Sequence, residues 1–442
     1  MSNIKYPAYV SKAYLLKLAI PIFISNLVIP LVSIVDTALM GHLSNQSYLA
    51  ATAIASSVIT MVFWSFGFLR MGTVGQVAQS LGKGDYREVV SSLLRSIILA
   101  LILSFLIIIS KPLIISGIIH FFKPSNNILD LVDKYITIRV FSAPAELTIY
   151  VLTGFFLGLQ KTKISSSLVS VFCLFNILFS IYFVKSLNLN ISGVALGTLT
   201  AAYLSILIFI FYTHFFIVKK FKIIPRISKN LFNRKKIVKF FNINFDIFIR
   251  TILLTFSFLW IQYLSAKLGE NYLAVNTILM QFIIISSFFL DAYAYATEGV
   301  VGFSLGRKIK KTFLMNVKNS IEISFITSII ISFIFILFAK NFVNLLTDLE
   351  LIRFLSYSFL FWIVAIPPIA SFCYQLDGIF IGTSQTSEMR NAMIVSVLIY
   401  IPLSLYLFEL IENHGIWLSL MILMLLRSAT LQFYFPKILK RF

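Results

Sequence analysis

Residues 30–41 read Pro30-Leu-Val-Ser-Ile-Val-Asp36-Thr-Ala-Leu-Met-Gly41 and close an apolar stretch that begins near residue 14. A helix rises about 1.5 Å per residue, so a stretch of this length crosses the hydrocarbon core of a bilayer, which is about 30 Å thick. Asp36 is its one acidic residue. The stretch therefore predicts a transmembrane helix that carries a carboxyl group inside the membrane.

Similar apolar stretches recur along all 442 residues, of which 59% are hydrophobic and 12% charged, with a mean hydropathy of +0.93. This composition suits lipid rather than water as the surrounding medium. Open strand edges do not survive in lipid, so we predict helices and an all-α membrane protein. Twelve transmembrane helices are expected, near residues 14–40, 50–80, 93–120, 133–158, 165–185, 192–217, 238–265, 272–302, 317–345, 353–383, 391–409 and 414–436.

The basic residues lie mainly on one side of these spans. The net charge is +20, and most of the 37 lysines and arginines fall in alternate connections, nine of them between Lys219 and Lys239. Because cytoplasmic loops are rich in Lys and Arg, this alternation predicts an even number of spans with both termini in the cytoplasm. It also explains the positive charge without a nucleic-acid partner. No signal peptide precedes the first span, so we expect the amino terminus to be retained.

An internal repeat divides the chain. One constant shift along the sequence places Tyr48-Leu-Ala50 on Tyr272-Leu-Ala274, Leu81-Gly82 on Leu305-Gly306, and Gly154 and Gly158 on Gly378 and Gly382. The repeat predicts an amino-terminal six-helix lobe at 1–217, a basic cytoplasmic linker at 218–237 and a carboxyl-terminal six-helix lobe at 238–442. Six spans per half make the two bundles parallel repeats, an arrangement typical of transporters that work by alternating access.

Four polar side chains are expected at one depth in the amino-terminal lobe. Asp36 lies five residues before Gly41, Ser180 lies five residues before Lys185, and Thr198 lies six residues after Ser192. Asn176 precedes Ser180 by one helical turn. A buried ionisable group costs about 2.5 to 3.5 kcal/mol on insertion scales, so Asp36 needs a function or a partner. A carboxylate, an amide oxygen and hydroxyls at one level predict a site for a proton or a hard cation such as sodium.

Other side chains are candidates for binding a transported compound. Asn26, Ser33 and Asp36 share one helical face by their spacings of seven and three. Met61 and Trp64 in the second span are candidates for contact with an aromatic or cationic compound. Polar residues such as Asn176, Ser180 and Thr198 also join helices without any further role, so this alternative stays open for each of them.

Several further charges lie inside the predicted spans of the carboxyl-terminal lobe. Asp291 and Glu298 are seven residues apart on one helical face, and they either form a second charged site or pair with an arginine of the other lobe. Asp246 and Arg250 are spaced four apart, which favours an ion pair along one helix. Asp377 stands beside Gly378 at the end of a span and has no role assigned from the sequence.

Three segments resemble the multidrug and toxic compound extrusion family of antiporters, within it the branch named for the DNA-damage-inducible protein F. They are Val35-Asp-Thr-Ala-Leu-Met-Gly-His42, Phe66-Gly-Phe-Leu-Arg-Met-Gly-Thr-Val-Gly-Gln-Val-Ala-Gln79 and Leu376-Asp-Gly-Ile-Phe-Ile-Gly-Thr-Ser-Gln-Thr-Ser-Glu-Met-Arg-Asn-Ala392. The resemblance covers nearly the whole chain. It implies two six-helix lobes around a cleft and export of cationic, amphipathic compounds against protons or sodium.

Residue by residue, the resemblance makes Asp36 the coupling carboxylate and Asn176 and Thr198 its polar partners, which are also the side chains expected for a sodium ion. Many members carry a second acid where this chain has Ser180, so a relay of two carboxylates is weakened. The simplest mechanism is competition for Asp36 between a proton and a cationic compound. We expect no cofactor, no resident metal, and a protein that works as a monomer in a bacterial inner membrane.

The sequence supports two other functions less well. A flippase for lipid-linked precursors shares the two-lobe plan but predicts several basic residues along the cleft, whereas the four arginines within the spans lie mostly near acids or span ends. A membrane enzyme such as an acyltransferase needs an embedded histidine, yet the four histidines lie at span ends or in loops. The phosphate-binding pattern GxxxxGK[ST] is absent from the sequence, which gives ATP-driven transport no support.

Overall fold

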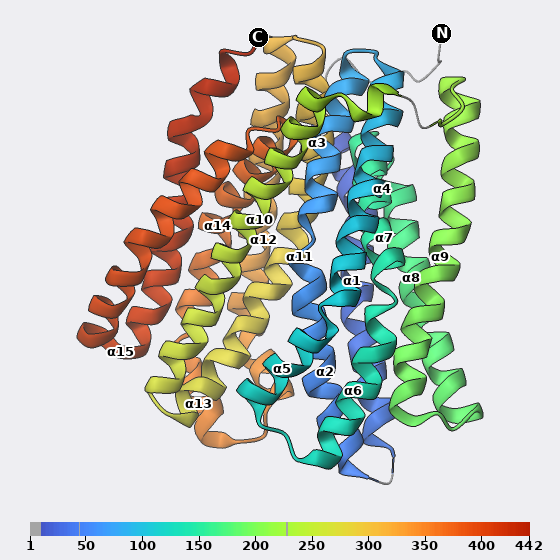
Figure 1. Cartoon of the computed structure of the whole chain (residues 1–442). Helices are drawn as coiled ribbons and strands as arrows, with labels where there is room; N and C mark the ends of the chain where they lie inside the picture. Colours follow the sequence, from blue (N-terminus) through green and yellow to red (C-terminus); the bar gives the residue numbers. More distant parts are fainter. Residues whose placement is uncertain (1–9, 44, 227–228) are drawn as a thin grey trace. The chain divides into compact units, whose positions relative to one another are not determined.

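A computed structural model of the chain describes residues 10–43, 45–226 and 229–442, with the side chains of 229 and 230 left out. Helices account for nearly all of this part of the chain, which contains no β-strand (Figure 1). The predicted all-α class is therefore confirmed. By packing, the helices form an amino-terminal unit, Pro21–Phe241, and a carboxyl-terminal unit, Asn242–Phe442, which also includes the first turns of α1 up to Ile20.

In the amino-terminal unit, α3 packs against α4 and α7, α8 packs against α9, and α2 packs against α6. A short π-helix, Tyr182–Ser186, follows α8, and a 3-10 turn, Lys229–Phe232, follows α9. The bounds are α1 Lys12–Gly41, α2 Gln46–Trp64, α3 Phe68–Gly82, α4 Tyr86–Ile109, α5 Lys111–Phe122, α6 Asn126–Val140, α7 Ala143–Gly158, α8 Thr162–Ile181 and α9 Asn190–Phe221.

In the carboxyl-terminal unit, α14 is the central helix, because it packs against α11, α12 and α15. Its core includes Phe282, Ile363, Cys373 and Trp417. The first turn of α1 is fixed to α12 in the same unit, where Lys12 Nζ lies 2.6 Å from Glu322 Oε2. The bounds are α10 Arg234–Lys267, α11 Glu270–Gly306, α12 Lys310–Leu346, α13 Glu350–Ser358, α14 Leu360–Gly382 and α15 Thr386–Leu439.

The number of spans agrees with the sequence. In the described part of the chain, ten helices are long and apolar enough to cross a membrane, and the bent pair α6 and α7 makes one more. The long α15 contains non-helical backbone at Ile411 and Glu412 and is therefore two helices. Counting it as two gives the twelve expected spans. The linker limits 218–237 stay a prediction, although α9 continues to Phe221 and α10 begins at Arg234.

Several predicted spans are interrupted. The expected helix at 133–158 is α6 followed by α7, bent by 50°. Pro144 stands in the first turn of α7, where a missing backbone N–H costs nothing, and the residues before a proline are biased away from helical geometry. Similar breaks divide the expected helices at 50–80, 93–120 and 353–383 into α2 and α3, α4 and α5, and α13 and α14.

The internal repeat is visible in how closely the helices approach. A Cβ atom added to Gly154 of α7 would lie 2.4 Å from the carbonyl oxygen of Arg70 in α3. A Cβ atom added to Gly378 of α14 would lie 2.7 Å from the carbonyl oxygen of Ala294 in α11. The constant shift of the repeat takes Gly154 to Gly378 and Arg70 to Ala294. The same backbone contact is therefore built twice.

Gly382 provides a test of this packing. A Cβ atom there would lie 2.3 Å from the carbonyl oxygen of Glu298, and a backbone atom cannot move aside as a side chain can. We expect Gly382→Ala to destabilise the protein by about 1–3 kcal/mol, as overpacking of a core does. Thermal unfolding of the purified protein in detergent measures this. Gly117→Ala in α5 is the control, since nothing lies within 4 Å of its added Cβ; equal melting of both variants would contradict the prediction.

Candidate functional site

The structure brings three of the predicted coupling residues into direct contact in the amino-terminal unit. Asn176 of α8 donates a hydrogen bond from Nδ2 to Thr198 Oγ1 of α9 at 3.1 Å. The Ser180 hydroxyl donates to Asn176 Oδ1 at 3.2 Å. All three side chains are buried. The i, i+4 spacing of Asn176 and Ser180 explains why both face α9.

A glycine allows α8 and α9 to approach at this point. A Cβ atom on Gly197 would lie 2.6 Å from both the backbone nitrogen and the hydroxyl oxygen of Ser180. Any larger residue would separate the two helices and lengthen the hydrogen bond between Asn176 and Thr198. Gly197 therefore helps to position the polar cluster, because it lets α8 and α9 come close enough for the hydrogen bond to form.

Asp36 of α1 joins this cluster. Its carboxyl group interacts with the Ser180 hydroxyl and, electrostatically, with Arg139 of α6. The Ser180 hydroxyl has one proton, which it can donate either to Asn176 Oδ1, at 3.2 Å, or to the Asp36 carboxyl group. Asp36 Oδ1 is buried and accepts no hydrogen bond from the described residues. A buried carboxylate oxygen without a donor is costly, and a proton or a cation at this position would remove the cost.

Arg139 does not neutralise Asp36 directly, because another acid holds it. Its guanidinium forms an ion pair with Glu146 of α7 and donates to the Ser142 hydroxyl at 2.5 Å. Ser142 in turn donates to Glu146 Oε1 at 2.6 Å. The guanidinium also lies 5.3 Å from the centre of the Phe63 ring. Both charges lie within the expected span at 133–158, and the bend between α6 and α7 brings them together.

At the positions of the carboxyl-terminal unit that correspond to Asp36 and Ser180, the internal repeat has two neutral side chains. The shift that takes Gly154 to Gly378 also takes Asp36 to Trp260 and Ser180 to Ser404. Trp260 Nε1 donates to Ser404 Oγ at 2.9 Å. The contact between the two helices is thus repeated, while the ionisable group is present in one unit only. The repeated contact itself therefore does not require an acid at this position.

The predicted substrate-binding residues lie on α1 and α2. Ser33 is exposed, Asn26 is partly buried, and the side chains of Met61 and Trp64 are 53% and 48% exposed. An exposed side chain on a membrane helix faces either lipid or a water-filled cleft. The role of these four residues therefore stays a prediction.

The second predicted charged pair lies on α11. Glu298 is buried and Asp291 is partly buried. Asp291 acts electrostatically on Tyr374 and Cys373 of α14. The backbone of Glu298 is the surface against which Gly382 packs. Asp291 therefore acts on α14 through its charge, and Glu298 contacts α14 through its backbone; a functional role for either acid stays a prediction.

The predicted ion pair between Asp246 and Arg250 is wrong. Asp246 of α10 instead accepts from Arg390 Nη1 at 2.6 Å and from the Thr386 hydroxyl at 3.0 Å. Arg250 pairs with Asp377 of α14. Partners on other helices replace the pair along one helix, because buried charges gain more from partners that hold them in place than from a flexible surface contact.

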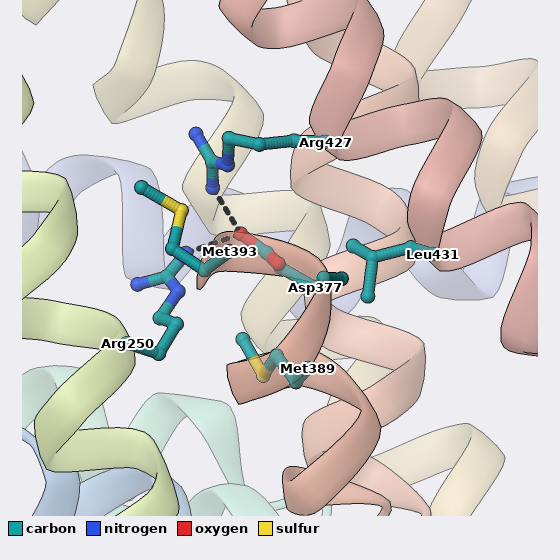
Figure 2. Close-up of a pocket in the computed structure, with 7 residues that line it drawn as sticks. Arg250, Asp377, Met389, Met393, Arg427 and Leu431 are labelled. Carbon is teal, nitrogen blue, oxygen red and sulfur yellow. Dashed lines mark hydrogen bonds and ion pairs between the residues drawn. The ribbon is translucent and has the colours of Figure 1, made fainter. Parts of the chain in front are cut away.

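A cluster that the sequence did not predict therefore centres on Asp377. Its Oδ2 atom accepts hydrogen bonds from both Arg250 and Arg427, the latter at 2.6 Å, as Figure 2 shows. All three side chains are buried. Two features of the sequence point to this cluster. Asp377 lies in the third segment that resembles the family, and Arg427 is a charged residue within an apolar span.

Apolar spans in two repeated units, with buried ionisable groups on the spans, define the class of integral membrane transporters. A family model described as MatE matches residues 21–182 and 247–406. The chain belongs to the MatE family.

The relatives agree with this assignment. DNA damage-inducible protein F of Escherichia coli is 32% identical over 94% of this chain and 90% of its own length. A probable multidrug resistance protein NorM of Photorhabdus laumondii is 26% identical over 97% of this chain and 95% of its own length. The solved outward-facing structure of a multidrug resistance MATE family transporter is 18% identical, has a TM-score of 0.85, and is covered over 97% of its length by 98% of this chain.

Proposed function

We propose that the protein is a secondary active exporter of cationic, amphipathic compounds, driven by the inward movement of protons or sodium. The family supports transport, and the names of several relatives, which are multidrug resistance proteins, support drug-like substrates. The observation that carries the coupling mechanism is Asp36, whose buried Oδ1 has no hydrogen bond from the described residues and lies beside the Ser180, Asn176 and Thr198 cluster.

In the proposed cycle, Asp36 is charged when it attracts a cationic compound from the cytoplasmic side. A proton that enters from outside then neutralises the carboxylate and removes the attraction, so the compound leaves. Ser180 supports both states, because its hydroxyl can turn from Asn176 towards a charged Asp36 carboxylate. Release of the proton to the cytoplasm restores the charge for the next cycle.

The hydrogen bonds of the cluster favour a proton over sodium. A sodium ion would need oxygen ligands from Asp36, Asn176 and Thr198. The Asn176 amide oxygen accepts from Ser180, while Thr198 Oγ1 accepts from Asn176 and donates to the Val194 carbonyl oxygen at 3.2 Å. A sodium ion would have to compete with these bonds, whereas a proton needs only the free Asp36 oxygen.

We also propose the membrane in which the protein works, its orientation and its oligomeric state. The apolar spans place the protein in a membrane, and the bacterial relatives support the inner membrane, with both termini in the cytoplasm and the monomer as the working unit. The flippase alternative is not favoured. Three of the four arginines within the spans are held by acids, Arg139 by Glu146 and the pair Arg250 and Arg427 by Asp377.

The test is efflux of a cationic dye from membrane vesicles under an imposed proton gradient and, separately, an imposed sodium gradient. We expect the proton gradient to drive dye movement and the sodium gradient to have no effect. Movement driven by sodium alone would assign the cluster to a sodium ion. Failure of both gradients, with the protein present in the membrane, would contradict coupled export of such dyes.

The repeat supplies a matched pair of serines for a finer test. Ser180→Ala removes the hydroxyl beside Asp36, and we expect coupled efflux to fall by about two- to tenfold, the effect of one hydrogen bond. Ser404→Ala removes the equivalent hydroxyl beside Trp260 and should leave efflux unchanged. Both variants are compared with the wild type in the vesicle assay. Equal losses in both would mean that Ser180 only packs.

A further inference from the structure

The Asp377 cluster borders a small pocket inside the carboxyl-terminal unit. Its charged lining is Arg250, Asp377 and Arg427, and its apolar lining includes Met389, Met393 and Leu431 (Figure 2). The volume of about 10 Å³ corresponds to one water molecule or one small ion. The lining comes from α10, α14 and both parts of α15, on either side of the break at Ile411.

The three side chains that bond to one another at this pocket carry unequal charge. Two guanidinium groups share one carboxylate, and both donate to the same oxygen, Asp377 Oδ2. The exposed fractions of Arg250, Asp377 and Arg427 are 7%, 7% and 5%, so water cannot surround the surplus positive charge. A buried charge without a partner is strongly unfavourable. The three bonded side chains therefore carry one surplus positive charge, and Asp291 of α11 is the further acid that acts on the neighbouring Cys373.

The hydrogen bonds are incomplete in the same place. Arg250 Nε is buried and donates no hydrogen bond to the described residues. An arginine has five N–H donors and no acceptor, so the missing partner must be an acceptor. An anion would supply both the acceptor and the negative charge.

We propose that this pocket binds one small monovalent anion of the size of chloride. The guanidinium groups of Arg250 and Arg427 hold it on the side away from Asp377 Oδ2, and the side chains of Met389 and Met393 exclude water. With the anion bound, the two guanidinium groups contact two negative groups, Asp377 and the anion. The bound anion joins α10 and α14 to both parts of α15 and stabilises the break in that helix.

Asp291 is the nearby charge that opposes this binding. It acts electrostatically on Tyr374 and Cys373, which also feel Asp377 and Arg427. Asp246, the acid of α10, is held by Arg390. Affinity for the anion is therefore expected to be set by Arg250 and Arg427 against Asp377 and Asp291.

The test measures the melting temperature of the purified protein in detergent while sodium gluconate is replaced by sodium chloride or bromide at constant ionic strength. We expect the halides to raise the melting temperature of the wild type in a saturable manner. Arg427→Gln should weaken the apparent affinity by about tenfold or more, because it removes a charged donor. Arg353→Gln, which changes an arginine of the same unit that pairs with the exposed Asp348, should keep the wild-type response.

A second variant keeps the test decisive if Arg427→Gln does not fold, because its expected effect on halide affinity has the opposite direction. Asp291→Asn removes the nearby negative charge that opposes the anion, leaves the three bonded side chains in place, and should tighten halide binding. In crystals soaked in bromide, the wild type should show an anomalous peak between Arg250 and Arg427. The same melting temperature in gluconate and halide, or no bromide peak, would overturn the proposal. These measurements need no transport, so their outcome is independent of the role of Asp36.

Discussion

Asp36→Asn is expected to reduce gradient-driven efflux to the level of passive leak. The amide keeps the shape of the side chain but can neither attract a cationic compound through a charge nor take up and release a proton. Loss of a charged partner costs about 1.5–3 kcal/mol, a reduction of about ten- to a hundredfold in transport. The measurement is dye efflux from vesicles that contain equal amounts of each variant in the membrane.

Asp133→Asn is the matched control for this prediction. Asp133 is a carboxylate of the same unit, but it pairs with Lys111 at 2.9 Å and is half exposed, so its change should leave efflux intact. An Asp36→Asn variant that transports as well as the wild type under both gradients would refute the proposed coupling. Coupling would then have to be sought at Asp291 and Glu298 of α11.

The fold could be predicted from the sequence because each of its two strongest signals is summed over many residues of the chain. Apolar length gives the spans, and the constant shift between the halves gives the two units, with Gly154 and Gly378 in equivalent contacts. The interruptions could not be predicted in the same way. Whether Pro144 bends a helix depends on Arg139 and Glu146, whose ion pair across the bend is a tertiary contact.

The candidate site was predictable in part. Depth along each span grouped Asn176, Ser180 and Thr198, since residues at one level on neighbouring helices meet. The Asp377 cluster was not predictable, because Arg250 and Arg427 are 127 and 50 residues away from Asp377 in sequence. A pairing rule based on spacing along one helix chose the wrong partner for Arg250.

Asp377→Leu is expected to produce the largest loss of stability among single changes in the carboxyl-terminal unit. It leaves two buried guanidinium groups, Arg250 and Arg427, without the carboxylate that both bond. Removal of one member of a buried ion pair costs about 3–5 kcal/mol, because the remaining charge is desolvated and unpaired. Thermal or denaturant unfolding in detergent, followed by tryptophan fluorescence, measures this loss. Asp348→Ala is the control, since Asp348 is exposed and should leave the unfolding midpoint unchanged.

The cause of that loss can be separated from a simple packing defect by removing the charges together. If unpaired charge is responsible, the triple variant Arg250→Met, Asp377→Leu and Arg427→Met should regain most of the lost stability, because an apolar cluster of similar volume has no charge to desolvate. If Asp377→Leu destabilises by distorting the packing of α14, the triple variant should be as unstable as the single one or worse. The triple variant also lacks both guanidinium groups, so its melting temperature should no longer respond to chloride. Recovered stability without a halide response would mean that the same three residues hold the unit together through their ion pairs and bind the anion through their surplus charge.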